Sequence, residues 1–458
     1  MKSIICGAGD VGYSIADKLS KENFEVTVVD ESKDRLKKIS ENLDVKTIIG
    51  VPSLPSTLSS AGAKDCDILI AVTKSDETNM ICCQIGHSLF EIPKKIARIR
   101  QQDYLKGEWQ NLYTTKNLPI DAIISPEEEV AKALYRRIKS PGTIDMLELA
   151  DNRLKLLGIK CETNTKVLGK TLRKLSDEFK DYLANILFVF RGEDKFIVNS
   201  NTILEKDDLI YMVVDNNNFV EVVKEFGHEE TQAQKIVIIG GGNIGYSLSK
   251  AVENSEYKIA TNIIEYDKAR SEYLATNLHS AVVTNGDGLD NTILEEVDIS
   301  EADYFIAVTD DDEVNILSSL LAKRAGAEHC ITLINNSSYS SLLNNIGIDI
   351  TIDPKLITIS KILEKVRGGL IRSDYTIAEG FGEVIEAEIL SNSSFTNKNI
   401  NQIDLPKSIR VGAILRKDNI IIPNSETIFE ENDDVVFFSE TKSIKQLENL
   451  LSISKTYA

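Results

Sequence analysis

The chain carries the glycine pattern G-x-G-x-x-G twice, about half its length apart. The copies are Gly7-Ala8-Gly9-Asp10-Val11-Gly12 and Gly240-Gly241-Gly242-Asn243-Ile244-Gly245. Each follows a short apolar segment and precedes a helical pattern, and a second apolar segment then ends in an acid, Asp30 or Glu265. The glycines alone are a weak signal, but strand, glycines, helix, strand and terminal acid in this order form a dinucleotide-binding signature. The sequence therefore predicts two nucleotide-binding units.

The similarity between the halves extends well beyond the glycines. Residues 67–73 match residues 303–309, and residues 76–79 match residues 312–315. A constant offset over about a hundred residues indicates duplication of a whole domain, because short solenoid repeats have much shorter periods.

The pattern of strands and helices predicts an α/β fold, with two tandem Rossmann-like doubly wound parallel sheets, each followed by a small α+β module. In the first half we expect parallel strands at 2–6, 24–29, 45–49, 67–72, 95–100 and 119–124. Single cores stop growing at roughly 250–300 residues, so 458 residues imply several domains. We expect nucleotide-binding domains at 1–124 and 235–353, connecting helices at 125–142 and 354–369, small modules at 143–226 and 370–458, and a linker at 227–234.

The composition of the chain limits the classes of molecule that it can bind. The net charge of −19 argues against nucleic acid and against an anionic membrane surface, because both require clustered Lys and Arg. We expect no signal peptide, since Met1 and Lys2 lead directly into the first strand, and no membrane span. The six cysteines show no C-x-x-C pair and are expected to be buried thiols of a cytoplasmic protein.

Two capped helices follow the nucleotide-binding sheets. Ser125 is a predicted N-cap, Pro126 suits the first helical position, and Glu128 completes a capping box. Asp353-Pro354 begins the corresponding helix of the second half. We expect their apolar residues to pack against a neighbouring domain, between halves or between chains; packing onto the helix's own domain is the alternative.

The small modules are expected to contain mainly short strands. In the first, Met146 to Cys161 predicts two strands broken at Gly158, followed by strands at 186–191, 195–198 and 209–214. In the second, strands are expected at 383–389, 400–405, 409–416, 419–423 and 434–438.

The nucleotide chemistry follows from the glycines and the two acids. The first glycine permits the turn, the second lets the backbone approach a pyrophosphate, and the third allows helix and strand to pack closely. Asp30 and Glu265 are expected to accept hydrogen bonds from ribose hydroxyls and to repel a 2′-phosphate. NAD or an adenine nucleotide is therefore favoured over NADP.

Several functional classes remain open on the residues alone. A hydride-transfer enzyme needs a proton donor beside the nicotinamide, and neither small module carries a His, Cys or Lys constellation. A dehydrogenase or epimerase stays an alternative, as does a scaffold whose nucleotide sites have decayed. The acids of 76–77 and 310–313 could bind a divalent cation, although acids before a helix are also favoured by its dipole.

The combined motifs resemble the regulator-of-K⁺-conductance (RCK, or KTN) family, and in particular the peripheral subunits of Trk-type potassium uptake systems with two such domains in tandem. The residues that carry the resemblance are the two glycine patterns, 71–73 with 76–80, 97–100, 285–288, 412–416 and 422–426. The resemblance covers the whole chain in order.

The resemblance implies a non-enzymatic cytoplasmic regulator that assembles as a homo-oligomeric RCK ring beneath a membrane-embedded K⁺-translocating Trk subunit. Binding of NAD(H), or of ATP or ADP, would gate the ion path. By position, the family's first site corresponds to Gly7 to Val11, Asp30, Thr73, Lys74 and Arg98. The second corresponds to Gly240 to Ile244, Glu265, Thr309 and Asp310.

The two sites depart from the family pattern in different places. The family has Gly-Asp after the third strand, where the acid meets adenosine; the second half keeps Gly286-Asp287, whereas the first has Gly50-Val51. The first half keeps Arg98 and Arg100, but Leu333 and Asn335 replace them in the second. Because guanidinium groups are strong phosphate ligands, the resemblance implies two inequivalent sites.

Overall fold

The computed structural model describes residues 1–458 except 22–23, 141, 164, 193, 229–232, 340–342, 344–347, 349, 367–370, 378–380 and 452–458. The chain forms two compact units, each assembled from both halves of the sequence. One unit comprises 1–135 and 234–366, and the other comprises 136–233 and 367–458. Half of the predicted linker 227–234, namely residues 229–232, lies outside the described residues.

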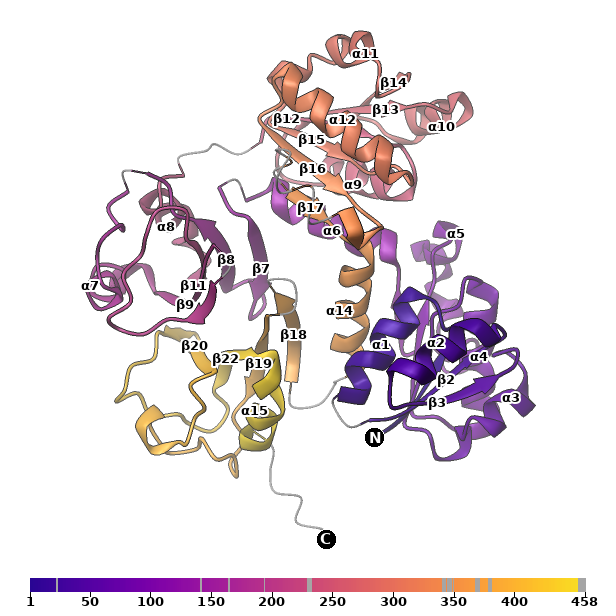
Figure 1. Cartoon of the computed structure of the whole chain (residues 1–458), viewed down its shortest axis with the longest axis horizontal. Helices are drawn as coiled ribbons and strands as arrows, with labels where there is room; N and C mark the ends of the chain where they lie inside the picture. Colours follow the sequence, from indigo (N-terminus) through magenta and orange to yellow (C-terminus); the bar gives the residue numbers. More distant parts are fainter. Residues whose placement is uncertain are drawn as a thin grey trace. The chain divides into compact units, whose positions relative to one another are not determined.

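The first unit contains two parallel six-stranded sheets with the same topology (Figure 1). The first sheet has the order β3-β2-β1-β4-β5-β6 and the second β14-β13-β12-β15-β16-β17. The strands of the first are β1 (Lys2–Cys6), β2 (Glu25–Asp30), β3 (Lys46–Ile49), β4 (Ile68–Ala71), β5 (Lys94–Arg98) and β6 (Ala122–Ile124). Those of the second are β12 (Lys235–Ile239), β13 (Ala260–Glu265), β14 (Val282–Asn285), β15 (Tyr304–Ala307), β16 (His329–Leu333) and β17 (Ile350–Ile352). This is the doubly wound Rossmann order, so the predicted fold class is confirmed.

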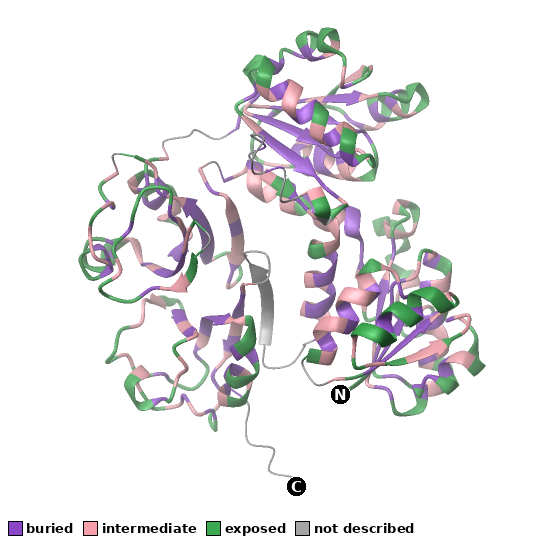
Figure 2. Ribbon diagram, viewed as in Figure 1, coloured by how far each residue is buried: buried purple, intermediate pink, exposed green. Residues whose placement is uncertain are grey.

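Helices connect the strands and cover the sheets. In the first domain they are α1 (Asp10–Lys21), α2 (Lys33–Asn42), α3 (Pro55–Ser60), α4 (Asp76–Phe90) and α5 (Gln102–Leu105). In the second they are α9 (Asn243–Glu253), α10 (Lys268–Asn277), α11 (Asn291–Glu296) and α12 (Asp312–Ala325). Figure 2 shows the consequence: central strands are buried, whereas helices alternate between buried and exposed residues. Successive residues of β1 contribute to two different core clusters, Ile5 to one and Ile4 to the other, as expected for a sheet covered on both faces.

The helix that follows the second sheet packs on the first domain. α14 (Pro354–Val366) contributes Ile359, Ile362, Leu363 and Val366 to the core cluster that contains Ile5 of β1. The expectation that this helix packs against a neighbouring domain is therefore confirmed, and the neighbour is the domain of the other half. Its counterpart, α6 (Pro126–Ile138), begins with the predicted N-cap, because Ser125 Oγ accepts from the Glu128 amide at 3.5 Å. The apolar residues of α6 are buried as well: Val130, Ala131, Leu134 and Ile138.

The second unit contains two five-stranded antiparallel sheets that also share one topology. Their orders are β10-β9-β11-β8-β7 and, in the equivalent direction, β21-β20-β22-β19-β18. The first module has β7 (Asp145–Leu149), β8 (Leu154–Lys160), β9 (Ala184–Arg191), β10 (Asp194–Ile197) and β11 (Leu209–Asp215), with α7 (Leu172–Glu178) and α8 (Phe219–Glu225). The second has β18 (Ile371–Ile377), β19 (Gly382–Glu388), β20 (Ile409–Arg416), β21 (Asn419–Ile421) and β22 (Asp434–Glu440), with α15 (Ile444–Leu451).

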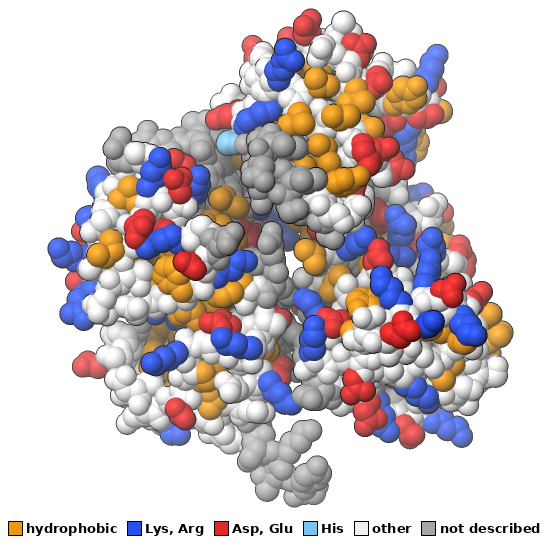
Figure 3. All heavy atoms as spheres, viewed as in Figure 1, with side chains coloured by type: hydrophobic (Ala, Val, Ile, Leu, Met, Phe, Trp, Pro, Cys, Tyr) orange, Lys and Arg blue, Asp and Glu red, His pale blue; other side chains and the backbone are white. Residues whose placement is uncertain are grey.

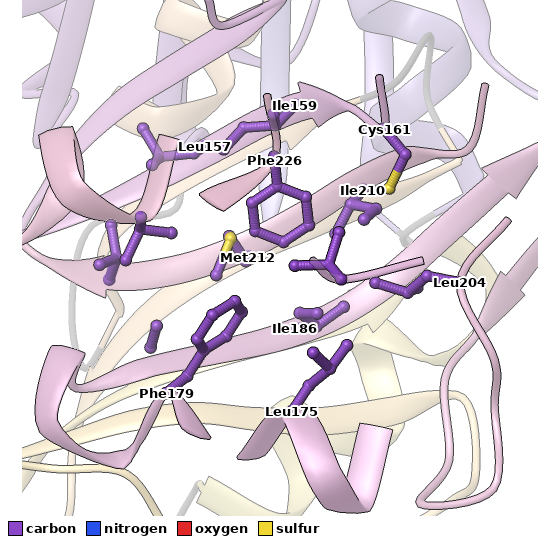
Figure 4. Packing of buried hydrophobic residues seen from close by; sticks show 14 of the residues in the cluster. Leu157, Ile159, Cys161, Leu175, Phe179, Ile186, Leu204, Ile210, Met212 and Phe226 are labelled. Atoms are coloured by element: carbon purple, nitrogen blue, oxygen red, sulfur yellow. The ribbon is translucent and has the colours of Figure 1, made fainter. Parts of the chain in front are cut away.

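Each sheet of the second unit has two apolar faces with different partners. In the first module one face packs beneath its own helices, where Phe179, Met212 and Phe226 meet (Figure 4). The other face packs against the second module, and Phe188 stacks on Phe438 with ring centroids 4.3 Å apart. Hydrogen bonds join the modules at this contact: Asn185 Nδ2 donates to the carbonyls of Val411 and Gly412, and Arg410 Nη1 donates to Val198.

Two expectations for the small modules were wrong, and one strand was missed. Gly158 does not break a strand but lies within β8, where a Cβ would come 3.0 Å from Asp145 Cβ and 3.1 Å from the Tyr211 ring. The break falls at Ala150 to Asn152, where three residues with positive φ form the turn between β7 and β8. Residues 400–405 do not form a strand, because 400–402 is a short 3₁₀ helix. Strand β18 was not predicted.

On the face seen in Figure 3, acidic and basic side chains are interleaved, with hydrophobic side chains between them. In the described part of the chain, the helices are too short or too polar to cross a membrane.

Candidate nucleotide-binding site

The first glycine loop joins β1 to α1, and each glycine has a separate physical reason. Gly7 has φ +114°, and a Cβ there would lie 3.0 Å from the Thr73 amide nitrogen. At Gly12 a Cβ would come 1.9 Å from the Gly7 carbonyl oxygen, so α1 could not start so close to β1. A Cβ on Gly9 would meet no atom within 4 Å. Protein packing therefore explains the outer glycines, whereas the space at Gly9 is open to a ligand.

The second loop repeats this arrangement. Gly240 has φ +96°, and a Cβ on Gly245 would come 2.1 Å from the Gly240 carbonyl oxygen. A Cβ on Gly242, the counterpart of Gly9, would again meet nothing within 4 Å. Both loops thus leave open space at the central glycine, where the signature places a pyrophosphate.

The acids at the ends of the second strands hold the loops. Asp30 Oδ2 accepts from the Ala8 amide at 2.7 Å, and Oδ1 accepts from the Ser32 amide at 2.8 Å. Glu265 does the same, with Oε2 accepting from Gly241 at 2.6 Å and Oε1 from Asp267 at 2.8 Å. Each carboxylate oxygen keeps a second lone pair for a ribose hydroxyl, so fixing the loop and binding sugar are compatible.

Most of the predicted site residues line a cavity within the first unit. From the first half these are Gly7, Ala8, Gly9, Asp10, Val11, Asp30, Thr73, Lys74 and Arg98; from the second, Gly240, Gly242, Asn243, Ile244, Glu265, Asp287, Thr309 and Asp310. Gly12, Gly241 and Gly245 are not among the lining residues. Gly12 and Gly245 are packed against their own loops, and Gly241 is tied to Glu265 through its amide.

Arg98 and Arg100 both line the cavity but have different surroundings. Arg98 Nη2 donates to the Thr73 carbonyl at 2.8 Å, while its buried Nε has no hydrogen-bond partner among the described residues. Burial lowers the pKa of Arg98 from its usual value. Arg100 Nε pairs with Glu127 Oε1 at 2.7 Å, at the start of α6. The two arginines thus differ in that Arg98 is held by a backbone carbonyl and Arg100 by a carboxylate.

The second half lacks these two cations but has another that sequence reasoning missed. Leu333 is buried, and Asn335 Nδ2 donates to Asp312 at 3.1 Å. Arg270 lines the cavity and donates through Nε to the Gly241 carbonyl at 2.6 Å. Its counterpart Arg35 also lines the cavity. The sequence does contain a signal for these arginines, because each lies five residues after the acid that ends the second strand, Asp30 or Glu265.

Two of the acidic residues that follow β4 and β15, Asp76 and Asp312, stabilise the fold. Asp76 accepts from the amides of Arg100 and Gln101 at 2.9 and 2.8 Å, which ties the start of α4 to the end of β5. Asp312 accepts from Asn335 and Asn336 in the same way. Among the described residues, His, Cys, Asp and Glu do not gather in groups of three that could hold a metal ion.

The loop after the third strand differs between the halves, as the departures from the family pattern implied. Gly286, Asp287 and Gly288 line the cavity in the second half, and Asp287 Oδ1 accepts from the Leu289 amide at 2.9 Å. In the first half Pro52 lines the cavity at this point. The first half therefore lacks a carboxylate at the place where the second has one.

Two protein-family models match parts of the chain. A model described as the TrkA-N domain matches residues 3–126 and 236–354, and one described as the TrkA-C domain matches residues 384–452. Among solved structures, the chain is similar to the GsuK RCK domain, with a TM-score of 0.62, 18% identity and coverage of 98% of this chain and 94% of that one. A GsuK channel bound to NAD gives the same TM-score and identity, covering 98% and 78%.

Curated relatives match over their full length. The chain is 38% identical to the Trk system potassium uptake protein TrkA of Azorhizobium caulinodans, over 99% of each chain. It is 35% identical to TrkA of Haemophilus influenzae, again over 99% of each chain. The chain therefore belongs to the TrkA family of Trk-system potassium uptake proteins.

Proposed function

We propose that the chain is a cytoplasmic regulatory subunit of a Trk potassium uptake system, and that it changes ion uptake when nucleotide binds its glycine loops. It would be peripheral to the membrane and bound to a K⁺-translocating subunit. The observation that carries the proposal is the repeated loop: a central glycine facing open space, and an acid that holds the loop from the neighbouring strand. Regulation, not catalysis, is the role.

NAD(H) and ATP or ADP are the ligands we propose. Each presents a ribose for Asp30 or Glu265 and a pyrophosphate for the open space at the central glycine. NAD is also the nucleotide in the GsuK structure whose fold this chain shares. We also propose that the nucleotide-binding domains span 1–124 and 235–353 and that the small modules span 143–226 and 370–458.

Gating needs only a difference in affinity. A ligand that binds two shapes of the subunit unequally shifts the population toward the shape it prefers. α14 provides a route, because it leaves the second domain at the cavity and packs in the core of the first. We propose that a homo-oligomeric ring of such subunits transmits the shift to the membrane subunit.

Calorimetric titration of the full chain with NADH, NAD⁺, ATP and ADP tests the nucleotide assignment. Gly9→Val and Gly242→Val each add a Cβ where it would meet no atom within 4 Å, so each should abolish binding at one site while folding is kept. Gly107→Val is a matched control, since a Cβ there also meets nothing within 4 Å and Gly107 does not line the cavity. Unchanged affinity in both loop variants would refute the assignment.

A further inference from the structure

A lysine from the second half reaches the glycine loop of the first. Lys355 lies in the first turn of α14, and its Nζ is 2.8 Å from Oδ2 of Asp10. Asp10 is the first residue of α1 and the fourth of the glycine pattern. Both line the cavity, together with Gly9 and Arg98. The cation therefore stands beside the phosphate position of the first site.

The position of Lys355 is fixed by packing and not by this ion pair alone. Ile359, Ile362 and Leu363, further along α14, are buried in the core cluster of the first domain. The start of the helix is capped by Asp353, whose Oδ1 accepts from the Lys355 amide at 2.7 Å. Because the helix is held at both points, Lys355 can exchange partners without moving the backbone.

The electrostatics favour such an exchange. Lys355 lowers the pKa of Asp10, so that carboxylate is ionised at neutral pH. An anion at the start of α1 opposes the binding of a second anion there, and a nearby cation removes that opposition. The Lys355 side chain is about a third exposed and its Nζ has three donors, so it can bond a phosphate oxygen as well.

The corresponding residues at the start of α6 and α9 do not form an ion pair like that of Lys355 and Asp10. Ser125-Pro126-Glu127 corresponds to Asp353-Pro354-Lys355, and Asn243 corresponds to Asp10. Glu127 is an acid and pairs with Arg100. At this position, therefore, the second half provides a cation and the first half provides an anion.

We propose that Lys355 is a phosphate-binding residue of the first nucleotide site, contributed by the second half of the chain. On binding, its ammonium group passes from Asp10 to a phosphate oxygen of a nucleoside polyphosphate. This inference rests on the proposed nucleotide-binding function. It makes the first site a product of both halves, so its occupancy strengthens the attachment of α14 to the first domain.

The test measures ATP and AMP affinity of the full chain carrying Gly242→Val, in which the first site is observed alone. Lys355→Gln should weaken ATP binding about tenfold, because a charge-assisted phosphate contact is lost. AMP should lose less, and Lys355→Arg should restore most of the ATP affinity. Lys361→Gln is the control, because Lys361 lies on the same helix and pairs with Glu364.

Combination with Asp10→Asn separates direct binding from charge neutralisation. If Lys355 contacts phosphate, Lys355→Gln weakens ATP binding in the Asp10→Asn background as well. A loss that disappears in that background would overturn the proposal, since Lys355 would then act only by neutralising Asp10. Unchanged ATP affinity in Lys355→Gln would also overturn it while leaving nucleotide binding intact. If the Gly242→Val chain binds no nucleotide, the first-site function itself fails, and this inference with it.

Discussion

The carboxylate of Asp30 and the amide of Ala8 are joined by a 2.7 Å hydrogen bond that ties the end of β2 to the glycine loop. The acid expected to meet a ribose is therefore also a structural member of the loop. Glu265 and Gly241 form the same bond in the second half at 2.6 Å. Because both halves keep the bond, loop geometry and ligand binding depend on one side chain at each site.

Asp30→Ala should destabilise the protein even without nucleotide. The amides of Ala8 and Ser32 lose a charged acceptor, and we expect the free energy of unfolding to fall by about 1–3 kcal/mol. Asp30→Asn keeps an acceptor oxygen and should lose less. Urea denaturation in nucleotide-free buffer measures both. Wild-type stability in Asp30→Ala would mean that the carboxylate serves a ligand alone.

Ile362→Ala should weaken the attachment of α14 to the first domain. Ile362 is fully buried in the core cluster that contains Ile5 and Ile15, and a truncation of this kind costs about 2–5 kcal/mol. Leu356→Ala, on the same helix at a half-exposed position, should change stability by less than about 1 kcal/mol. Thermal or urea unfolding of the pair gives the comparison, and equal losses would contradict the observed packing.

Lys155 should make stability rise with pH. The side chain is 4% exposed, its Nζ lies 3.5 Å from the centroid of the Phe219 ring, and burial lowers its pKa to about 8. Its pKa in the unfolded chain is about 10.4. Between these values the unfolded chain binds the proton and the folded chain does not, so raising the pH favours folding.

The matched variant is Lys155→Met, which lacks the titrating group. From pH 7 to pH 10 the wild type should gain about 2–3 kcal/mol relative to Lys155→Met. Urea unfolding at several pH values measures the difference. Parallel pH profiles for the two proteins would show that Lys155 titrates normally.

The folded protein should resist thiol reagents. All six cysteines are buried, and burial raises the pKa of Cys66 to about 11 and that of Cys161 to about 12. Thiolate is the reactive form, so maleimide at pH 7.5 should label the chain only after unfolding. Mass spectrometry would count the labels, and modification of the folded chain would locate an opening of the core.

The sequence predicted both nucleotide-binding sheets because their local signals agree. The apolar run at 2–6, the glycines after it and Asp30 specify strand, turn and second strand without reference to distant residues. The small modules were harder. In the sequence, Gly158 suggests a break in a strand. In the structure a glycine is required there because a Cβ would come 3.1 Å from the ring of Tyr211, which lies on another strand of the sheet.

Local sequence patterns could not predict which residues far apart in the chain contact one another. The apolar stripe of α14 predicted burial, but nothing in it identified Ile5 and Ile15 as the surface it covers. Lys355 and Asp10 are 345 positions apart, and neither belongs to a motif that mentions the other. Arg270 was missed because its role depends on the carbonyls of Gly241 and Gly242.

The most direct test is K⁺ flux through the partner membrane subunit reconstituted in vesicles with this chain. The account predicts that NADH or ATP changes the flux with the wild-type chain, and that the Gly9→Val, Gly242→Val double variant still binds the membrane subunit but leaves the flux independent of nucleotide. A double variant that responds to nucleotide as the wild type does would contradict regulation through the two glycine loops.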